Sequence, residues 1–180
     1  TDTNRLVMKW RGCFLDADDW LSPDALASAV AVFENHPQTD CVLFTVNYIY
    51  PDHQECYPMP PFESLQGREA FRLSLDWQIH GVYMVRAALH RRFPYDETCH
   101  SYSDDNTTRL HYYKSAEVRC CEGVFYYRIC HASVTHQPSL RRFDWMRANE
   151  SMKRHLQRLG VDERIMRKWE TRRMMILVDC

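Results

Sequence analysis

Residues 12–24 read GCFLDADDWLSPD, and this stretch decides the expected fold. Gly12 to Leu15 form a short apolar run that stops at three acids, Asp16, Asp18 and Asp19. An apolar run bounded in this way is typical of a buried strand. The pattern therefore predicts a strand that delivers carboxylates at its C-terminal end, where ligands bind in open α/β sheets.

Strand and helix patterns alternate along the rest of the chain. Ser22, Pro23 and Asp24 suit the N-cap, the first position and the first turn of a helix that runs to about residue 36. Further strands are expected at 41–50, 81–85 and 120–129, helices at 67–75, 87–92 and 106–113, and a proline-rich loop at 51–61. Residues 140–177 are helical and basic, with a break at 160–161. This alternation predicts an α/β fold with a sheet flanked by helices and a C-terminal helical extension.

Composition excludes several classes of protein. The 180 residues suffice for one domain, or for one domain with an appendage. Only 5 glycines occur, and neither glycine-rich phosphate-loop motif is found. No apolar run approaches the roughly 20 residues that span a bilayer, and the first residues do not suggest a signal peptide. Among the eight cysteines there is no C-x-x-C pair, so reduced, mostly buried thiols are expected and a zinc site is the weaker alternative.

Charge is unevenly distributed. Residues 1–138 carry 12 Lys and Arg against 18 Asp and Glu, whereas residues 139–180, the C-terminal extension, carry 11 against 6. The extension can be a solvated helical face or a docking surface for an anionic partner. An acidic body without a recognised DNA- or RNA-binding signature argues against nucleic acid as a partner.

The acids after the first strand suit a hard divalent cation, Mg²⁺ or Mn²⁺. A helix-capping turn is the alternative, but three packed carboxylates repel one another unless a cation or donors lie among them. An EF-hand loop is excluded because its alternating oxygen ligands and glycine are missing after Asp18. A phosphatase of the haloacid dehalogenase type also begins with a strand and D-x-D. It remains the enzymatic rival, although Trp20 stands where that type has a small residue.

Two later segments carry further candidates. Asp104 and Asp105 precede the helix at 106–113, where the helix dipole holds a carboxylate ionised and able to act as a general base. They can equally be a helix cap with an acidic first turn. Arg128 and His131 follow the aromatic strand, where Arg can clamp phosphate and His can ligate a metal.

Five segments in this order resemble the family 2 glycosyltransferases, which have the GT-A fold. These segments are FLDADDWLSPDAL, DCVLFTVNYIY, GVYMVRAALHRRFPYDE, YSDDNTTRL and YYRICHASVT, and the matched stretch runs from about residue 12 to residue 135. The resemblance implies transfer of a sugar, with inversion, from a nucleotide-sugar donor to a hydroxyl of a saccharide or lipid-linked acceptor. The expected setting is synthesis of cell-surface polysaccharide or glycolipid.

The resemblance also assigns roles to individual residues. Asp18 would bind Mn²⁺ or Mg²⁺, Asp16 would help to hold the nucleotide or the metal, and Asp19 would support the turn. Asp105 would be the base. Asp104 stands where many members have Glu.

The sequence departs from the family pattern at its N-terminal end. Only fifteen residues precede Asp16, where family members have a nucleotide-binding half. Residues 1–138 are therefore interpreted as the C-terminal portion of a GT-A catalytic domain, with an exposed sheet edge that favours a homodimer. An inactive interaction module is the non-enzymatic alternative.

The resemblance suggests a cytoplasmic protein, with the C-terminal extension either packed on the catalytic domain or lying on an anionic membrane. Membrane contact would involve its basic residues together with apolar Trp145, Met146, Trp169 and Met175.

Overall fold

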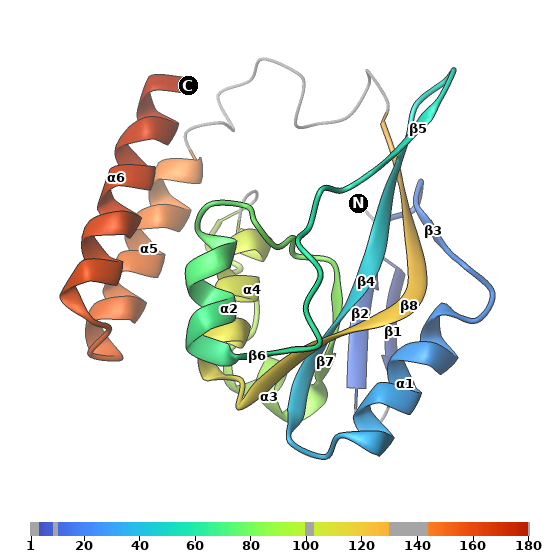
Figure 1. Ribbon diagram of the computed structural model, residues 1–180. Helices are drawn as coiled ribbons and strands as arrows, with labels where there is room; N and C mark the ends of the chain where they lie inside the picture. Colours follow the sequence, from blue (N-terminus) through green and yellow to red (C-terminus); the bar gives the residue numbers. More distant parts are fainter. Residues whose placement is uncertain (1–3, 9–10, 100–102, 130–143, 180) are drawn as a thin grey trace.

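The computed structural model describes residues 4–8, 11–99, 103–129 and 144–179. Its centre is an eight-stranded mixed sheet with the order β1-β2-β7-β4-β8-β3, in which β5 pairs with β4 and β6 pairs with β8 (Figure 1). The strands are β1 Asn4–Met8, β2 Arg11–Leu15, β3 Trp20–Leu21, β4 Thr39–Ile49, β5 Gln54–Cys56, β6 Ser64–Gln66, β7 Tyr83–Arg86 and β8 Glu117–Arg128. The helices are α1 Ala25–Asn35, α2 Gly67–Ser74, α3 Ala87–Arg92, α4 Ser103–Lys114, α5 Asp144–Arg158 and α6 Glu163–Asp179. The predicted α/β fold with helices around a mixed sheet is confirmed.

Strand directions bring three strand ends to one edge of the sheet. Both β2 and β4 run antiparallel to β7, and β8 runs parallel to β4. The C-terminal ends of β2, β4 and β8 therefore lie at the same edge, which we call the carboxyl edge. The acids after Leu15 and the residues around Arg128 meet there although more than a hundred positions separate them in the sequence.

Two apolar cores cover the two faces of the sheet. On one face α1 packs through Phe33 against Val42 and Phe44 of β4. On the other face Leu43 of β4 belongs to a larger core that includes Phe71 of α2, together with residues of α4, α5 and α6. Because side chains alternate along a strand, β4 is buried on both faces, as expected for a central strand. Figure 1 shows α1 on one side of the sheet, and α2 and α4 on the other with α5 and α6 beyond them.

Two glycines allow elements to approach closely. A Cβ at Gly123 of β8 would lie 2.6 Å from the Cα of Ala25, so only glycine lets the start of α1 rest on this strand. A Cβ at Gly67 would lie 2.1 Å from the carbonyl oxygen of Ser115, where α2 begins beside the end of α4. Both contacts fix helix ends next to the sheet.

The structure corrects three local predictions. Ser22 is not the N-cap of α1, which begins after Asp24, because the Ser22 hydroxyl donates to Asp24 and accepts from the Val124 backbone N–H. The expected loop at 51–61 contains β5, which forms a hairpin with β4. An N-terminal strand, β1, was not predicted, and it pairs with the side of β2 that faces away from β7.

The C-terminal helices pack on the body of the protein. Trp169 of α6 is fully buried, as are Met152 and Leu156 of α5, and all three belong to the larger core. The membrane interpretation is therefore wrong for Trp169, which has no surface to offer a lipid. Many basic residues of α5 and α6 form ion pairs, such as Lys153 with Glu170 at 2.6 Å. Within the described residues, no helix combines the length and the apolar character needed to span a bilayer.

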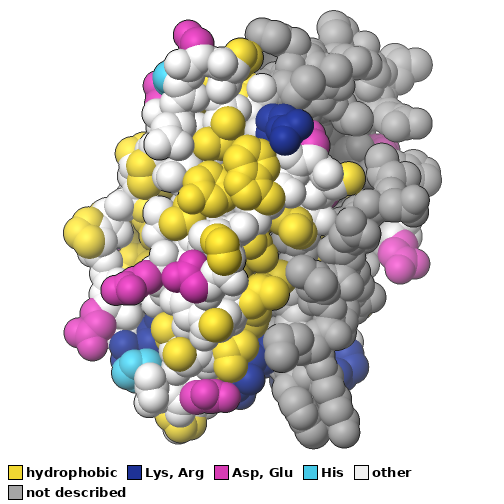
Figure 2. All heavy atoms as spheres, turned by 90° about the vertical axis from the view of Figure 1, so that its right-hand side faces the viewer, with side chains coloured by type: hydrophobic (Ala, Val, Ile, Leu, Met, Phe, Trp, Pro, Cys, Tyr) yellow, Lys and Arg dark blue, Asp and Glu magenta, His cyan; other side chains and the backbone are white. Residues whose placement is uncertain are grey.

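The side of the molecule that carries α1 and β3 has a different surface. Figure 2 shows apolar side chains gathered across this side, with acidic groups beside them and few basic ones. Trp20 of β3 is 37% exposed and is one of the large apolar residues at the surface. This side lies beside the carboxyl edge.

Candidate active site

The acidic loop after β2 is tied to β8 by hydrogen bonds. Within the loop, the backbone N–H of Asp19 donates to the carbonyl oxygen of Asp16 at 3.2 Å and closes a turn. The backbone N–H of Arg128 donates to the Asp19 carboxylate at 2.9 Å. The N–H of Ser22 donates to the carbonyl of Val124 at 2.8 Å, which extends the pairing of β3 with β8. The loop is therefore held at the carboxyl edge by the strand that ends beside it.

Electrostatic repulsion concentrates at this loop. Partial burial and the neighbouring carboxylates raise the pKa of Asp19 to about 6, against the stabilising hydrogen bond from Arg128. Partial burial, Asp18 and Asp104 raise the pKa of Asp16. An acid whose pKa is raised by like charges gains from a cation among them. The loop thus has the electrostatic character of a cation site.

Helix α4 brings a second acidic pair to the same edge. The sequence predicted that Asp104 and Asp105 precede this helix. The helix begins at Ser103, so both residues lie in its first turn. Asp104 is exposed and close enough to Asp16 to act on its pKa. The structure therefore brings together the predicted residues Asp16, Asp18, Asp19 and Asp104.

Asp105 occupies a different environment from Asp104. Its side chain is 27% exposed, and its carboxylate lies 3.7 Å from the guanidinium of Arg109, one turn further along α4. Burial raises the pKa of Asp105 above the ordinary range of Asp, while the nearby Arg109 guanidinium opposes this rise. A partly desolvated carboxylate binds a proton more readily than a fully exposed one.

Arg128 contributes through its backbone and its stacking. Its guanidinium carbon lies 5.3 Å from the centre of the Trp20 ring, and Trp20 in turn stacks on Tyr126 at 5.2 Å. The Arg128 side chain thus lies along an aromatic surface beside the acids, within electrostatic reach of Asp19. Its predicted role as a phosphate clamp stays a prediction, and His131 lies outside the described residues.

The fit of a divalent cation depends on how many ligands the protein must supply. Among the residues that the structure describes, no group of three or more His, Cys, Asp or Glu gathers as a metal site. Mg²⁺ commonly takes only one or two carboxylates and completes its shell with substrate phosphates and water. The repelling pair Asp16 and Asp18 fits this mode of binding.

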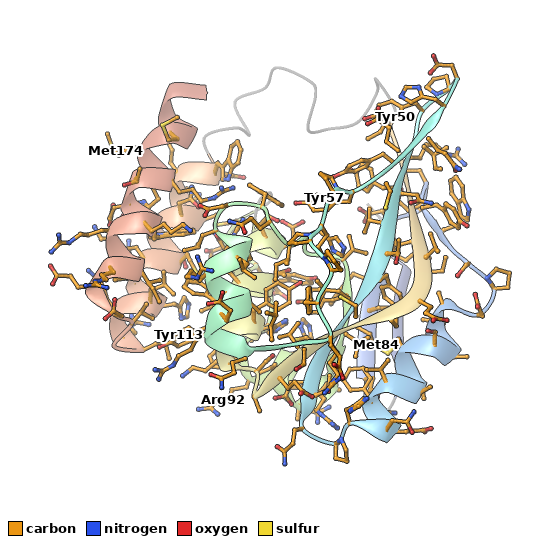
Figure 3. The ribbon with its side chains drawn as sticks, viewed as in Figure 1. Tyr50, Tyr57, Met84, Arg92, Tyr113 and Met174 are labelled. Carbon is orange, nitrogen blue, oxygen red and sulfur yellow. The ribbon has the colours of Figure 1, made fainter. Side chains whose placement is uncertain are left out.

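Several residues near Asp105 were missed by the sequence patterns. Trp77, with a positive φ of 56°, follows α2, and its carbonyl accepts a hydrogen bond from the Tyr57 hydroxyl. Figure 3 shows Tyr57 on the segment that leads away from β5, on the side toward α2 and α4. The pocket at this point is lined by residues that include Trp77, His80, Asp105 and Arg109. No periodicity marks Tyr57, Trp77 and His80, because they lie in loops, whereas Arg109 lies one turn after Asp105 on α4.

Tyr127 is a further residue that the patterns did not single out. It is partly buried at the end of β8, and the carboxylates of the acidic loop act with burial to raise its pKa. The sequence signal that could have identified Tyr127 is its position at the end of an aromatic strand, one residue before Arg128.

This mixed sheet flanked by helices, with carboxylates at its carboxyl edge, has a counterpart among solved structures. The chain is similar to S. aureus TarS residues 1–349 in complex with UDP-GlcNAc, with a TM-score of 0.71 and 14% sequence identity over 90% of this chain. The same TarS segment without that ligand gives a TM-score of 0.69 at 13% identity over 93% of this chain. A longer TarS structure gives 0.62 at 15% identity over 88% of this chain and 26% of that one.

The chain spans about half of the TarS segment, since the matches cover 48% of its length. No protein-family model matches the sequence, and no curated protein matches it. At these identities the comparison establishes the fold. The function has to be argued from the site.

Proposed function

We propose that this chain contributes the acidic half of a glycosyltransferase active site, which transfers a sugar from a nucleotide-sugar donor to a hydroxyl acceptor with inversion. One observation carries the proposal. Asp16, Asp18 and Asp19 lie together at the carboxyl edge, with Asp104 within electrostatic reach of Asp16, on a sheet whose fold resembles TarS, and TarS has been solved with UDP-GlcNAc and with UDP.

In this proposal the acidic loop receives the diphosphate of the donor. The acidic loop and the diphosphate are both negatively charged and repel each other. Mn²⁺ or Mg²⁺ held by Asp16 and Asp18 would neutralise the charge on the departing nucleoside diphosphate. Asp19 keeps the loop in its turn through the backbone N–H of Arg128. Trp20 and Arg128 offer a stacked aromatic and cationic surface next to the loop.

The acceptor is activated by Asp105. Its carboxylate takes the proton of the acceptor hydroxyl while the oxygen forms a bond to the anomeric carbon of the sugar. The bond from that carbon to the diphosphate oxygen breaks, and the nucleoside diphosphate leaves from the opposite face, which inverts the configuration. Burial raises the pKa of Asp105 while the Arg109 guanidinium opposes this rise, and a carboxylate in such a setting is suited to take a proton from a hydroxyl.

The test is ligand-dependent thermal stability. Mn²⁺, UDP and UDP-GlcNAc are added singly and in combination to the wild-type chain and to Asp18→Asn. Mn²⁺ with UDP at about a hundred times the dissociation constant should raise Tm by roughly 5–10 °C. The rise should require both components and should be absent in Asp18→Asn, because this variant removes the charge that the cation needs.

A matched control separates this effect from general loss of charge. Glu122→Gln removes an exposed carboxylate of β8 away from the acidic loop. It should keep the full response to Mn²⁺ and UDP. If the wild-type chain is well folded and its Tm does not change with Mn²⁺ and UDP together, these residues alone do not form a donor site. An equal response in Asp18→Asn would place the metal elsewhere.

A further inference from the structure

Two arginines from different helices meet at one tryptophan near Asp105. The guanidinium carbon of Arg109, on α4, lies 5.1 Å from the centre of the Trp77 ring. The guanidinium carbon of Arg172, on α6, lies at the same distance of 5.1 Å from that ring. Cation–π contacts of this kind hold a guanidinium over an aromatic face. The C-terminal helix therefore reaches the pocket that Asp105 lines.

The position of Arg172 is fixed by contacts on both sides. Its guanidinium donates to the carbonyl oxygen of Leu75 at 2.6 Å, which ties α6 to the segment after α2. One turn earlier, Lys168 forms an ion pair with Asp76, and Trp169 is fully buried in the larger core. These contacts fix the position of α6, so the contact of Arg172 with Trp77 follows from the packing of the helix and not only from the length of the arginine side chain.

The charges that face Asp105 come from three elements. Asp104 and Arg109 are on α4, Arg172 is on α6, and Tyr57 lies on the segment after β5. Burial raises the pKa of Asp105, Arg109 and Arg172 lower it, and Asp104 raises it. Burial, with the repulsion of Arg109, lowers the pKa of Arg172 to about 10. Both guanidinium groups lie against the Trp77 ring.

We propose that Arg172 is a positioning residue of the active site, through which α6 holds Trp77 in place and sets a second cation beside the Asp105–Arg109 pair. The proposal rests on the proposed function, in which Asp105 is the base. Arg109 alone lies 3.7 Å from Asp105 and is itself buried, so a second cation strengthens the field at the carboxylate. The C-terminal extension is then part of the catalytic apparatus and not an independent basic surface.

Neighbouring arginines of α6 have other partners and provide a control. Arg173 pairs with Glu150 at 2.8 Å and with Glu170 at 3.1 Å, which joins α6 to α5. Arg173→Met therefore removes one guanidinium from the same helix and leaves the Trp77 contact in place. Arg172→Met removes the charge at Trp77 with little change in side-chain length, and Arg172→Lys restores the charge.

The experiment is a titration of the Asp105 carboxyl carbon by NMR in the wild-type chain and in these three variants, with the resonance assigned from Asp105→Asn. In Arg172→Met the Asp105 pKa should rise by about one unit, the size of effect that a close opposite charge has on a carboxyl. Arg172→Lys should recover most of this difference, and Arg173→Met should show none. An unchanged Asp105 pKa in a folded Arg172→Met chain would overturn the proposal.

A reciprocal measurement covers the case in which Arg172→Met does not fold. In Asp105→Asn the Arg172 guanidinium, followed by its own carbon resonance, should lose its proton at lower pH than in the wild type, because coupling between two sites acts equally in both directions. No change at Arg172 would also overturn the proposal.

The titrations do not depend on catalysis, so the two proposals can fail separately. If the Asp105 pKa responds to Arg172 but the chain neither binds Mn²⁺ with UDP nor releases UDP from UDP-GlcNAc, the coupling stands and the proposed function fails. Where UDP release is measurable, the acidic limb of the pH profile of kcat should move to higher pH in Arg172→Met, with an unchanged KM for the donor. A loss of activity equal at all pH values would indicate a purely structural role.

Discussion

Trp169 offers the sharpest test of how α6 is joined to the protein. Its side chain is fully buried in the core that also contains Phe71 and Leu43, and its indole nitrogen has no hydrogen-bond partner among the described residues. Replacement of a buried Trp by Ala costs about 3–5 kcal/mol because it removes apolar contacts and leaves a cavity. For a chain of this size that cost corresponds to a fall in Tm of roughly 6–20 °C.

The indole N–H of Trp169, which has no hydrogen-bond partner among the described residues, has an opposite effect on stability. A buried donor without a partner costs about 1–3 kcal/mol. Trp169→Phe removes that donor while keeping a large ring, so the loss of packing and the relief of the donor should nearly cancel. We expect the free energy of unfolding of Trp169→Phe to lie within about 1 kcal/mol of the wild type.

The assay is urea unfolding followed by far-UV circular dichroism and by tryptophan fluorescence. Met174→Ala, on the same helix at a side chain 61% exposed, is the control and should change stability by less than about 0.5 kcal/mol. If Trp169→Ala behaves like Met174→Ala, α6 is not part of the cooperative core. If α6 unfolds in a separate early transition, the same conclusion follows.

Three further predictions concern the body of the protein. Gly123→Ala should destabilise the chain markedly in urea unfolding, because the new Cβ would overlap the backbone of α1; an unchanged midpoint would contradict the close packing. Burial lowers the pKa of both His80 and His111 to about 4, so stability present above pH 6.5 should fall as the pH drops toward 4, and His80→Asn should flatten this dependence. The pKa of Asp19 is raised to about 6, so its ionised form at pH 7 costs stability; Asp19→Asn should therefore raise Tm at pH 7 without added metal, with the difference vanishing near pH 4.

The sequence predicted best those elements whose signal is local. The run from Cys41 in β4 and the aromatic β8 are rich in β-branched and aromatic residues, and both appear within two or three positions of their expected bounds. The acids after β2 followed from one apolar run that ends abruptly. Their proximity to Asp104 was implied only by the family resemblance, because Asp104 lies in the first turn of a helix and not at a strand end.

The elements that were missed depend on partners far away in the sequence. The two residues of β3 form a strand only because β8 is beside them, with Trp20 opposite Tyr126. The surroundings of Asp105 require α6 to fold back onto the segment after α2, and nothing in the basic pattern of the extension distinguishes Arg172 from its neighbours. Trp77 takes a positive φ that its residue type does not suggest.

The pairing of β4 with β8 has a consequence for the order in which the chain can fold. This pairing joins residues 39–49 to residues 117–128, and β3 also pairs with β8. During synthesis from the N-terminus, β4 leaves the ribosome with both of its apolar faces complete and its parallel partner not yet made. Long-range parallel pairing forms slowly because a large loop must close first. The interval before β8 emerges is therefore when the nascent chain exposes most apolar surface, and it is the stage at which a chaperone would have the greatest effect on yield.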